Sequence, residues 1–171
     1  MSFLNEDTRK KIEELFLRYG PGIGSYILLR VGSAELAEEI TARVFLTVVR
    51  CIHQQNGSVV GWLWSIVRTE LSRLARERTH RAYPAELISP EALPEDRLER
   101  KEETDLLHAA LTQLSEEQQQ LISLKFFLGL RNQEIAQATG LTPSNVGVKL
   151  HRSLKELRNL MQPPAPTGKR V

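Results

Sequence analysis

The sequence predicts an all-α protein of two small helical domains joined by a flexible acidic linker. Apolar residues recur at helical spacing along most of the chain, whereas strand signals are scarce. Three prolines, Pro84, Pro90 and Pro94, punctuate a polar and acidic stretch that predicts the linker. The length of 171 residues suits one ordinary domain or two small ones. The predicted segments are the N-terminal domain, the linker, the C-terminal domain and a disordered tail, at residues 1–83, 84–102, 103–162 and 163–171.

The N-terminal domain is expected to begin with a helix that ends early. An apolar stripe from Ile12 to Tyr19 predicts this helix, and Gly20-Pro21 is expected to end it. After a short apolar segment, Ser33 is a suitable N-cap for a second helix with apolar residues at i, i+4 spacing. Cys51 is the only cysteine, which excludes an internal disulfide, and it is expected to be a buried core residue.

The last helix of this domain, predicted from about Val60 to Thr79, has one apolar and one arginine-rich face. A polar loop with the turn signal Asn56-Gly57 precedes it. The polar face consists of Ser65, Arg68, Thr69, Ser72, Arg73 and Arg76. Arginines beside aromatic residues can hold an unstacked single strand, which favours nucleic-acid binding by this face. Trp62 and Trp64 lie near the start of the helix, although each tryptophan by itself fits a core role better.

The C-terminal domain contains the strongest signal, a helix-turn-helix in RNQEIAQATGLTPSNVGVKLHRSLKELR. Asn132 is expected to cap a short helix, and Gly140 suits the left-handed position that ends it. Leu141 is expected to fill the corner. Thr142 is a suitable N-cap for the second helix, with Pro143 at its first position.

The second helix of this motif divides into a core face and an outer face. The core face consists of Val146, Leu150, Ser153, Leu154 and Leu157. The opposite face, with its flanks, consists of Ser144, Asn145, Val148, His151, Arg152, Lys155 and Arg158. Small, polar and basic groups on one side are what a helix in the major groove presents to DNA. Just upstream, Ser115 and Gln118 predict a capping box.

Charge and composition favour a polyanion-binding protein over an enzyme. The net charge is only +2, but basic blocks at residues 68–81 and from 141 onward flank an acidic stretch at 86–105. The four histidines are scattered, so no catalytic residue, metal site or cofactor is expected. No apolar run is long enough to span a membrane and no signal peptide is recognisable, so we expect a cytoplasmic protein without membrane insertion.

The arginine-rich helix and the helix-turn-helix follow each other along the chain as they do in the extracytoplasmic-function group of bacterial RNA polymerase sigma factors, and the sequence resembles that group. AEEITARVFLTVVR and GWLWSIVRTELSRLARER resemble the family's region two, and the run from LTQLSEEQQQ to KELR resembles region four. In that family, region two binds the polymerase clamp and melts the −10 element, and region four reads the −35 element. The resemblance implies core RNA polymerase and promoter DNA as partners. It also implies an anti-sigma factor as a further partner, since members of this group are often held by one.

The resemblance and the helical faces together predict three sets of binding residues. Contacts to the −35 element are expected from Ser144, Asn145, Val148, Lys149, His151, Arg152 and Lys155. Contacts to the −10 element are expected from Trp62, Trp64, Arg68, Thr69, Arg73 and Arg76, with Asn56 in the loop that would receive a flipped base. Polymerase contacts are expected from Glu38, Glu39, Phe45 and Leu46. Departures from the usual family residues are Ala42, Arg43, Thr69, Arg73, Gly147 and Val148.

The predicted function is that of a sigma factor, which directs core RNA polymerase to promoters through −10 melting and −35 recognition. One alternative is a non-sigma helix-turn-helix regulator with a ligand-sensing or dimerising N-terminal domain. The arginine-rich helix argues against this regulator, because a ligand-sensing domain does not need a face of exposed arginines. Another alternative is a sigma-like decoy that binds polymerase without DNA. The sequence leaves open how the two domains are arranged in the free protein.

Overall fold

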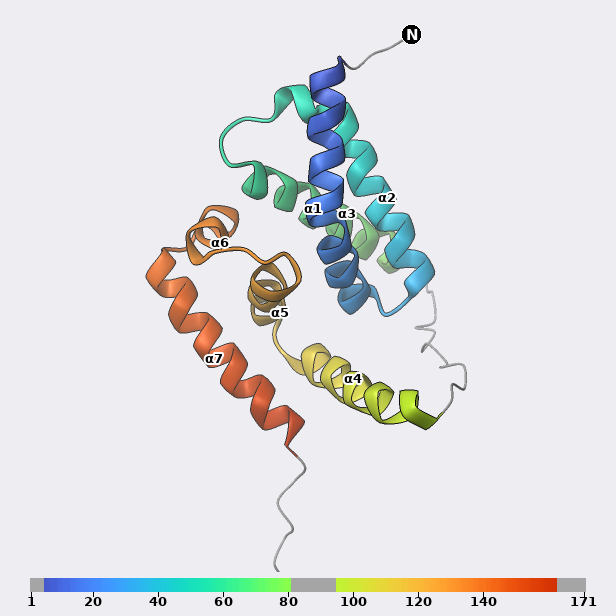
Figure 1. Ribbon diagram of the computed structural model, residues 1–171, viewed down its shortest axis with the longest axis vertical. Helices are drawn as coiled ribbons and strands as arrows, with labels where there is room; N and C mark the ends of the chain where they lie inside the picture. The colour runs from blue at the N-terminus through green and yellow to red at the C-terminus, as the bar shows by residue number, and fades with distance from the viewer. Residues whose placement is uncertain (1–4, 81–94, 163–171) are drawn as a thin grey trace, which may run out of the picture.

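The computed structural model describes the backbone of residues 5–80 and 95–162, and side chains over 5–77 and 104–162. The regular elements in these ranges are all helical, which confirms the predicted fold class (Figure 1). They are α1 (Glu6–Val31), α2 (Ala34–Cys51), η1 (Ile52–Gln54), α3 (Val59–His80), α4 (Glu95–Gln113), α5 (Glu116–Ile122), η2 (Ser123–Phe127), α6 (Asn132–Thr139) and α7 (Pro143–Met161). The short element η2 is π-helical.

The predicted linker and tail lie largely outside the described residues. The linker was expected over 84–102, but α4 begins at Glu95, so its last part is helical. The rest of the predicted linker and the tail at 163–171 lie outside the described residues. Of the described helices, none has both the length and the apolar character that crossing a membrane requires.

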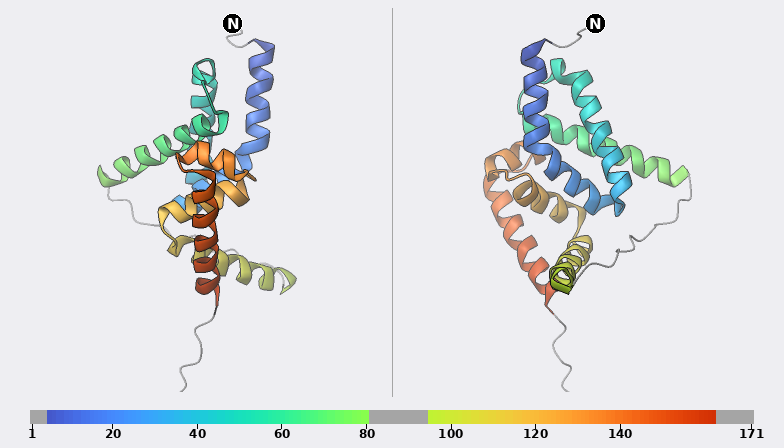
Figure 2. Two further views of the ribbon diagram at one scale, coloured as in Figure 1. Left: turned by 90° about the vertical axis from the view of Figure 1, so that its left-hand side faces the viewer. Right: turned by 45° about the vertical axis from the view of Figure 1, so that its right-hand side comes forward.

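Helix α1 does not end at Gly20-Pro21 as predicted but continues to Val31. A proline inside a helix removes one backbone hydrogen bond and usually costs about 3 kcal/mol. Here Tyr19 and Ile23 are buried on either side of Pro21, so packing of both halves of the helix outweighs that cost. The helix bends near its middle, as expected for an internal proline (Figure 2).

The predicted caps are largely confirmed. The Ser33 side chain accepts a hydrogen bond from the Leu36 N–H at 3.3 Å. Ser115 and Gln118 form the predicted capping box of α5. Cys51, by contrast, is half-buried and not a fully buried core residue.

One hydrophobic core joins the two halves of the chain. It combines Ile23, Val44 and Trp64 from the N-terminal half with Leu124 and Ile135 from the C-terminal half. Helix α3 packs against α6, and α1 packs against η2, so α1–α3 and α4–α7 form one body (Figures 1 and 2). The basic helix α3 and the helix-turn-helix are therefore in direct contact.

Candidate nucleic-acid interface

Helix α7 begins as the sequence predicted, because its local capping residues are all in place. Gly140 ends α6 with a left-handed backbone, at φ 76°, and its N–H donates to the Ala136 carbonyl. The Thr142 hydroxyl accepts from the Asn145 N–H at 3.2 Å, and Pro143 is the first helical residue. The helix-turn-helix geometry thus follows from hydrogen bonds that span only a few residues.

The start of α6 differs from the prediction. Asn132 is not the N-cap but the first helical residue, and its side-chain oxygen accepts from Lys125 Nζ at 3.2 Å. Arg131 takes the N-cap position, where its N–H donates to the Glu134 carboxylate at 2.8 Å. Glu134 is the third residue of the helix, and its hydrogen bond to the N-cap N–H is half of a capping box. This bond satisfies the start of the helix without an asparagine cap.

The two faces of α7 are separated largely as expected, but Leu154, which was predicted to lie on the core face, is 38% exposed. Val146, Leu150 and Ser153 are buried against the core. The predicted outer residues that are exposed are Ser144, Asn145, Val148, His151, Arg152, Lys155 and Arg158. Val148 is an apolar residue with half of its surface exposed, which suits contact with a thymine methyl group.

Lys149 is the exception on this helix. Its Nζ lies 2.8 Å from both carboxylate oxygens of Glu117 in α5. This ion pair ties α7 to α5 and occupies the ammonium group that was expected to face DNA. In the structure Lys149 therefore contributes first to packing within the C-terminal half.

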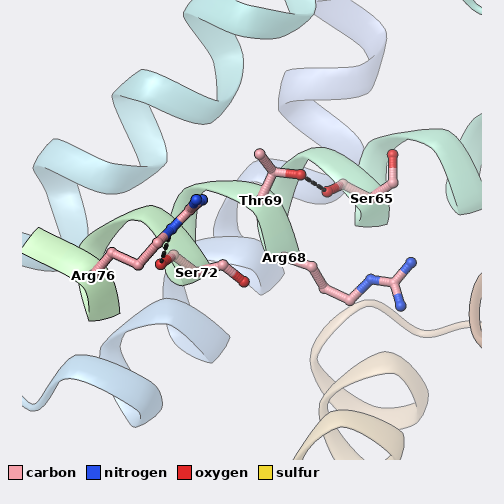
Figure 3. Close-up of a pocket in the computed structure, with 5 residues that line it drawn as sticks. All are labelled: Ser65, Arg68, Thr69, Ser72 and Arg76. Atoms are coloured by element: carbon pink, nitrogen blue, oxygen red, sulfur yellow. Dashed lines mark hydrogen bonds between the residues drawn. The ribbon is translucent and has the colours of Figure 1, made fainter.

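The exposed face of α3 carries a shallow basic pocket of about 400 Å³ (Figure 3). Its lining consists of Ser65, Arg68, Thr69, Ser72 and Arg76. The Thr69 hydroxyl donates to the Ser65 carbonyl, and Arg76 Nε folds back to the Ser72 carbonyl (Figure 3). Arg68 instead extends away from the helix axis (Figure 3). The two guanidinium groups do not converge on one point (Figure 3), but this face presents cations and hydroxyls, which are groups that bind the phosphates of a nucleic-acid backbone.

Trp64 does not lie on this face, so the expectation that it stacks on bases is wrong. Its side chain is 1% exposed and packs against Tyr26 with ring centroids 4.7 Å apart. Burial also raises the pKa of the Tyr26 phenol, an effect that the neighbouring Arg30 guanidinium partly offsets. Trp62 is half-buried at the edge of the core, and only this tryptophan keeps an accessible surface.

The loop before α3 is held by side chains that sequence reasoning missed. Lys11 Nζ of α1 donates to Gln55 Oε1 at 3.0 Å, and the Gln55 amide donates to the Gly57 carbonyl at 3.0 Å. Asn56, the residue predicted to meet a flipped base, is exposed and accepts from the Gly57 N–H at 2.9 Å. Lys11 and Gln55 are 44 positions apart, so no local pattern could pair them.

The predicted polymerase face of α2 is only partly at the surface. Glu38 and Glu39 are exposed, as is Leu46 at 54%. Phe45 is 7% exposed and forms an edge contact with Phe16, whose ring centroid lies 4.9 Å away. The prediction of a direct Phe45 contact is therefore wrong, because the ring fills the space between α1 and α2.

Arg43 links α2 to the basic helix. Its guanidinium bonds Glu39 at 3.1 Å and lies 3.9 Å from Glu77 of α3, which in turn pairs with Arg73 at 3.0 Å. The Arg43 side chain is mostly buried, so this pair holds the two helices together. Arg73 keeps an exposed side chain, but Glu77 restricts its direction.

The two predicted DNA-binding faces, on α3 and on α7, do not form one continuous surface. Helix α6 contacts both α3 and α7 and so stands between them. In the described part of the chain there is no cluster of three His, Cys, Asp or Glu side chains that could hold a metal ion. The candidate interface thus consists of two separate surfaces of basic and polar side chains within those residues.

Comparisons with known proteins relate the chain to one family. The family model described as Sigma-70, region 4 matches residues 104–157. The chain is 33% identical over 135 residues to RNA polymerase sigma factor SigV of Bacillus subtilis (strain 168), covering 78% of each chain. It is 26% identical over 159 residues to ECF RNA polymerase sigma factor SigX of the same strain, covering 86% of this chain and 82% of that protein.

The fold agrees as well. The sigma factor RpoE of Bartonella quintana, solved in complex with the anti-sigma factor NepR, superimposes with a TM-score of 0.67 at 17% identity. That match covers 91% of this chain and 99% of the solved one. By sequence relationship over most of its length, this chain belongs to the RNA polymerase sigma factors, in their extracytoplasmic-function group.

Proposed function

We propose that this protein directs core RNA polymerase to specific promoters and initiates transcription there. The observation that carries this proposal is the pair of amphipathic helices α3 and α7. Each buries one face in the core and exposes arginines and small polar groups on the other. Together with the matched region four, two such surfaces on one chain suit recognition of two separate promoter elements.

Helix α7 is assigned to the −35 element. Ser144, Asn145, Val148, His151 and Arg152 would reach base edges and phosphates in the major groove. Lys155 would add a phosphate contact further along the helix. Lys149 would act mainly by holding α7 against Glu117.

Helix α3 and its preceding loop are assigned to the −10 element. Arg68, Arg73 and Arg76 would hold the phosphates of the separated strand, with Thr69 beside them. Asn56 and Trp62 are placed at the loop end of the same helix, where an unstacked base would be received. The protein would supply no bond-making chemistry of its own, since positioning and strand separation are its contribution.

Polymerase is assigned to the exposed residues of α2, namely Glu38, Glu39 and Leu46. The site of action would be the bacterial cytoplasm, where polymerase and promoters are found. An anti-sigma factor is a further proposed partner, supported by the fold that this chain shares with a sigma factor solved in such a complex.

The test is transcription by purified core RNA polymerase, with and without this protein, on fragmented DNA from the source organism. New discrete transcripts that depend on the protein are expected, with two shared sequence elements upstream of their starts. If the protein binds duplex DNA but yields no new transcripts, the proposal fails and a helix-turn-helix regulator takes its place.

A further inference from the structure

One cation of the recognition helix α7 is already neutralised by a carboxylate of the same half of the chain. Lys149 Nζ donates to both carboxylate oxygens of Glu117, in the first turn of α5, at 2.8 Å. The other strongly basic residues of α7, namely Arg152, Lys155 and Arg158, have no ion pair in the part of the chain that the structure describes. Helix α7 therefore offers DNA one positive charge fewer than its sequence suggests.

Lys149 lies at the border between the outer face and the core face of α7. It is about 40° around the helix from Asn145 and about 60° from Arg152. Both of these residues are exposed, and residues three or four apart are neighbours on a helix surface. The Lys149 side chain is 37% exposed and has a flexible stem. An ammonium group that is free of Glu117 can therefore turn to the side of α7 that is proposed to face DNA.

A second contact holds α5 along the same side of α7. Gln118 Nε2 donates to Glu156 Oε2 at 2.6 Å, and Glu156 lies about two helical turns beyond Lys149. Gln118 also completes the capping box of α5 with Ser115. Glu117 is thus kept beside α7 by contacts of its neighbours, which do not depend on its own charge.

The Glu117 carboxylate and a DNA phosphate are rival anions for the Lys149 ammonium. A lysine that neutralises a phosphate releases a counterion, which tightens binding to DNA of any sequence. A lysine that is already paired within the protein must first break that pair. Glu117 is 54% exposed, so its negative charge also stays at the surface beside the recognition helix.

We infer that Glu117 limits the affinity of this protein for DNA by withholding Lys149 from the phosphate backbone. The inference rests on the proposed function, because it deepens the role of α7 at the −35 element. Phosphate contacts position a protein but carry no base information. Glu117 therefore lowers the affinity for all sequences alike and leaves base discrimination to outer residues such as Asn145 and Arg152. A lower affinity for every sequence shortens the time that the protein spends on DNA without a promoter.

The experiment compares Glu117→Gln with Glu116→Gln in the full-length protein. Both variants remove one negative charge from the first turn of α5 and keep the size of the side chain. Glu116 pairs with Arg30 of α1 at 3.0 Å and not with α7. Arg30 keeps its hydrogen bond to Gln119 in that variant, so Glu116→Gln is the matched control for net charge. Fluorescence anisotropy measures binding to a random-sequence duplex between about 50 and 200 mM salt.

Glu117→Gln should bind the random duplex about fivefold more tightly than the wild type at the low-salt end. The slope of the logarithm of its association constant against the logarithm of the salt concentration should steepen by about 0.9, as for one added phosphate contact. Glu116→Gln should keep the wild-type slope. A promoter duplex from the transcription experiment should gain the same factor as the random duplex, so the ratio of the two affinities stays unchanged.

The sign of the change separates this role from a purely structural one. If the ion pair serves to aim α7, Glu117→Gln should bind more weakly, and that result would overturn the inference, as would an unchanged slope. In a Lys149→Gln background, Glu117→Gln should have no more effect than Glu116→Gln. A full gain of affinity there would assign the effect to the lost negative charge alone and would also overturn the inference.

Two further controls keep the test decisive. Circular dichroism checks that helix content is unchanged, and Glu117→Ala, with the same expected gain, replaces Glu117→Gln if it is not. If the wild type binds neither duplex at any salt concentration, the DNA-binding role of α7 fails, and the proposed function fails with it. If the wild type binds DNA and the two glutamine variants behave alike, only the role of Glu117 fails.

Discussion

At the scale of single residues, the structure separates side chains that look alike in the sequence. Lys149 and Arg152 both belong to the predicted outer face of α7. Lys149 is engaged by Glu117, with 37% of its side chain exposed, whereas Arg152 is exposed and has no ion pair in the described part of the chain. Their roles should therefore differ even though both are cations on a recognition helix.

Replacing these two residues by alanine tests that difference. Arg152→Ala should weaken binding to a promoter duplex by about 1–3 kcal/mol, because a contact to a base edge or a phosphate is lost. Lys149→Ala should weaken binding less and should lower the free energy of unfolding by less than about 1 kcal/mol, since its ion pair is partly solvated. Fluorescence anisotropy and chemical unfolding provide the two measurements, and equal losses of affinity would contradict the assignment.

Tyr26 should make stability depend on pH in the alkaline range. Burial raises the pKa of its phenol above the usual 10.0, so the folded state holds the proton more tightly than the unfolded state does. The stabilising contribution is complete below pH 10 and is lost as the pH rises beyond it. Unfolding by urea at pH 8 and above pH 10 should show the decrease. Tyr26→Phe should show a smaller one, with the remainder from Tyr19, whose phenol pKa burial also raises.

At the scale of elements, helix α7 contains a glycine that its packing does not require. A Cβ on Gly147 would meet the Asn132 amide nitrogen at 3.6 Å, which is an ordinary contact. This separates Gly147 from Gly140, which ends α6 at φ 76° with nothing within 4 Å of an added Cβ. Replacing Gly147 by alanine therefore changes helix propensity alone, whereas replacing Gly140 by alanine introduces backbone strain alone.

Gly147→Ala should accordingly stabilise the protein by up to about 1 kcal/mol and raise its melting temperature by about 2–4 °C. Gly140→Ala should instead destabilise it by about 1–2 kcal/mol, because a residue with a Cβ is strained in the left-handed region. Thermal unfolding followed by circular dichroism measures both changes. A destabilising Gly147→Ala would show that α7 packs more tightly on α6 than the distances indicate.

At the scale of the whole molecule, the shared core makes the two halves one thermodynamic unit. Both tryptophans of the sequence lie in α3, so their fluorescence reports on the N-terminal half. Leu124 lies in η2 of the C-terminal half and is fully buried in the shared core. A cavity at Leu124 should therefore change the unfolding transition that tryptophan fluorescence reports.

Leu124→Ala should lower the free energy of unfolding by about 2–5 kcal/mol. Tryptophan fluorescence and circular dichroism should give the same lowered midpoint, as for a single cooperative transition. A fluorescence transition that stays at the wild-type midpoint would mean that the halves unfold independently.

The sequence by itself determined the helical class, the caps at Ser33, Ser115 and Thr142, and the two faces of α3 and α7. These features depend on residues within one or two helical turns of each other, where spacing alone decides which groups meet. It also identified the helix-turn-helix, because that signal is a run of local turn and capping residues.

The tertiary structure alone decided that α1 continues through Pro21, that Phe45 is a core residue, that Trp64 and not Trp62 is the fully buried tryptophan, and that Lys149 binds Glu117. It alone brought Gly22 against Phe127 and so joined the two halves. Each of these outcomes depends on contacts between segments far apart in the chain. Periodicity along one helix shows which face is apolar, but not which neighbour covers it or how closely the backbones approach.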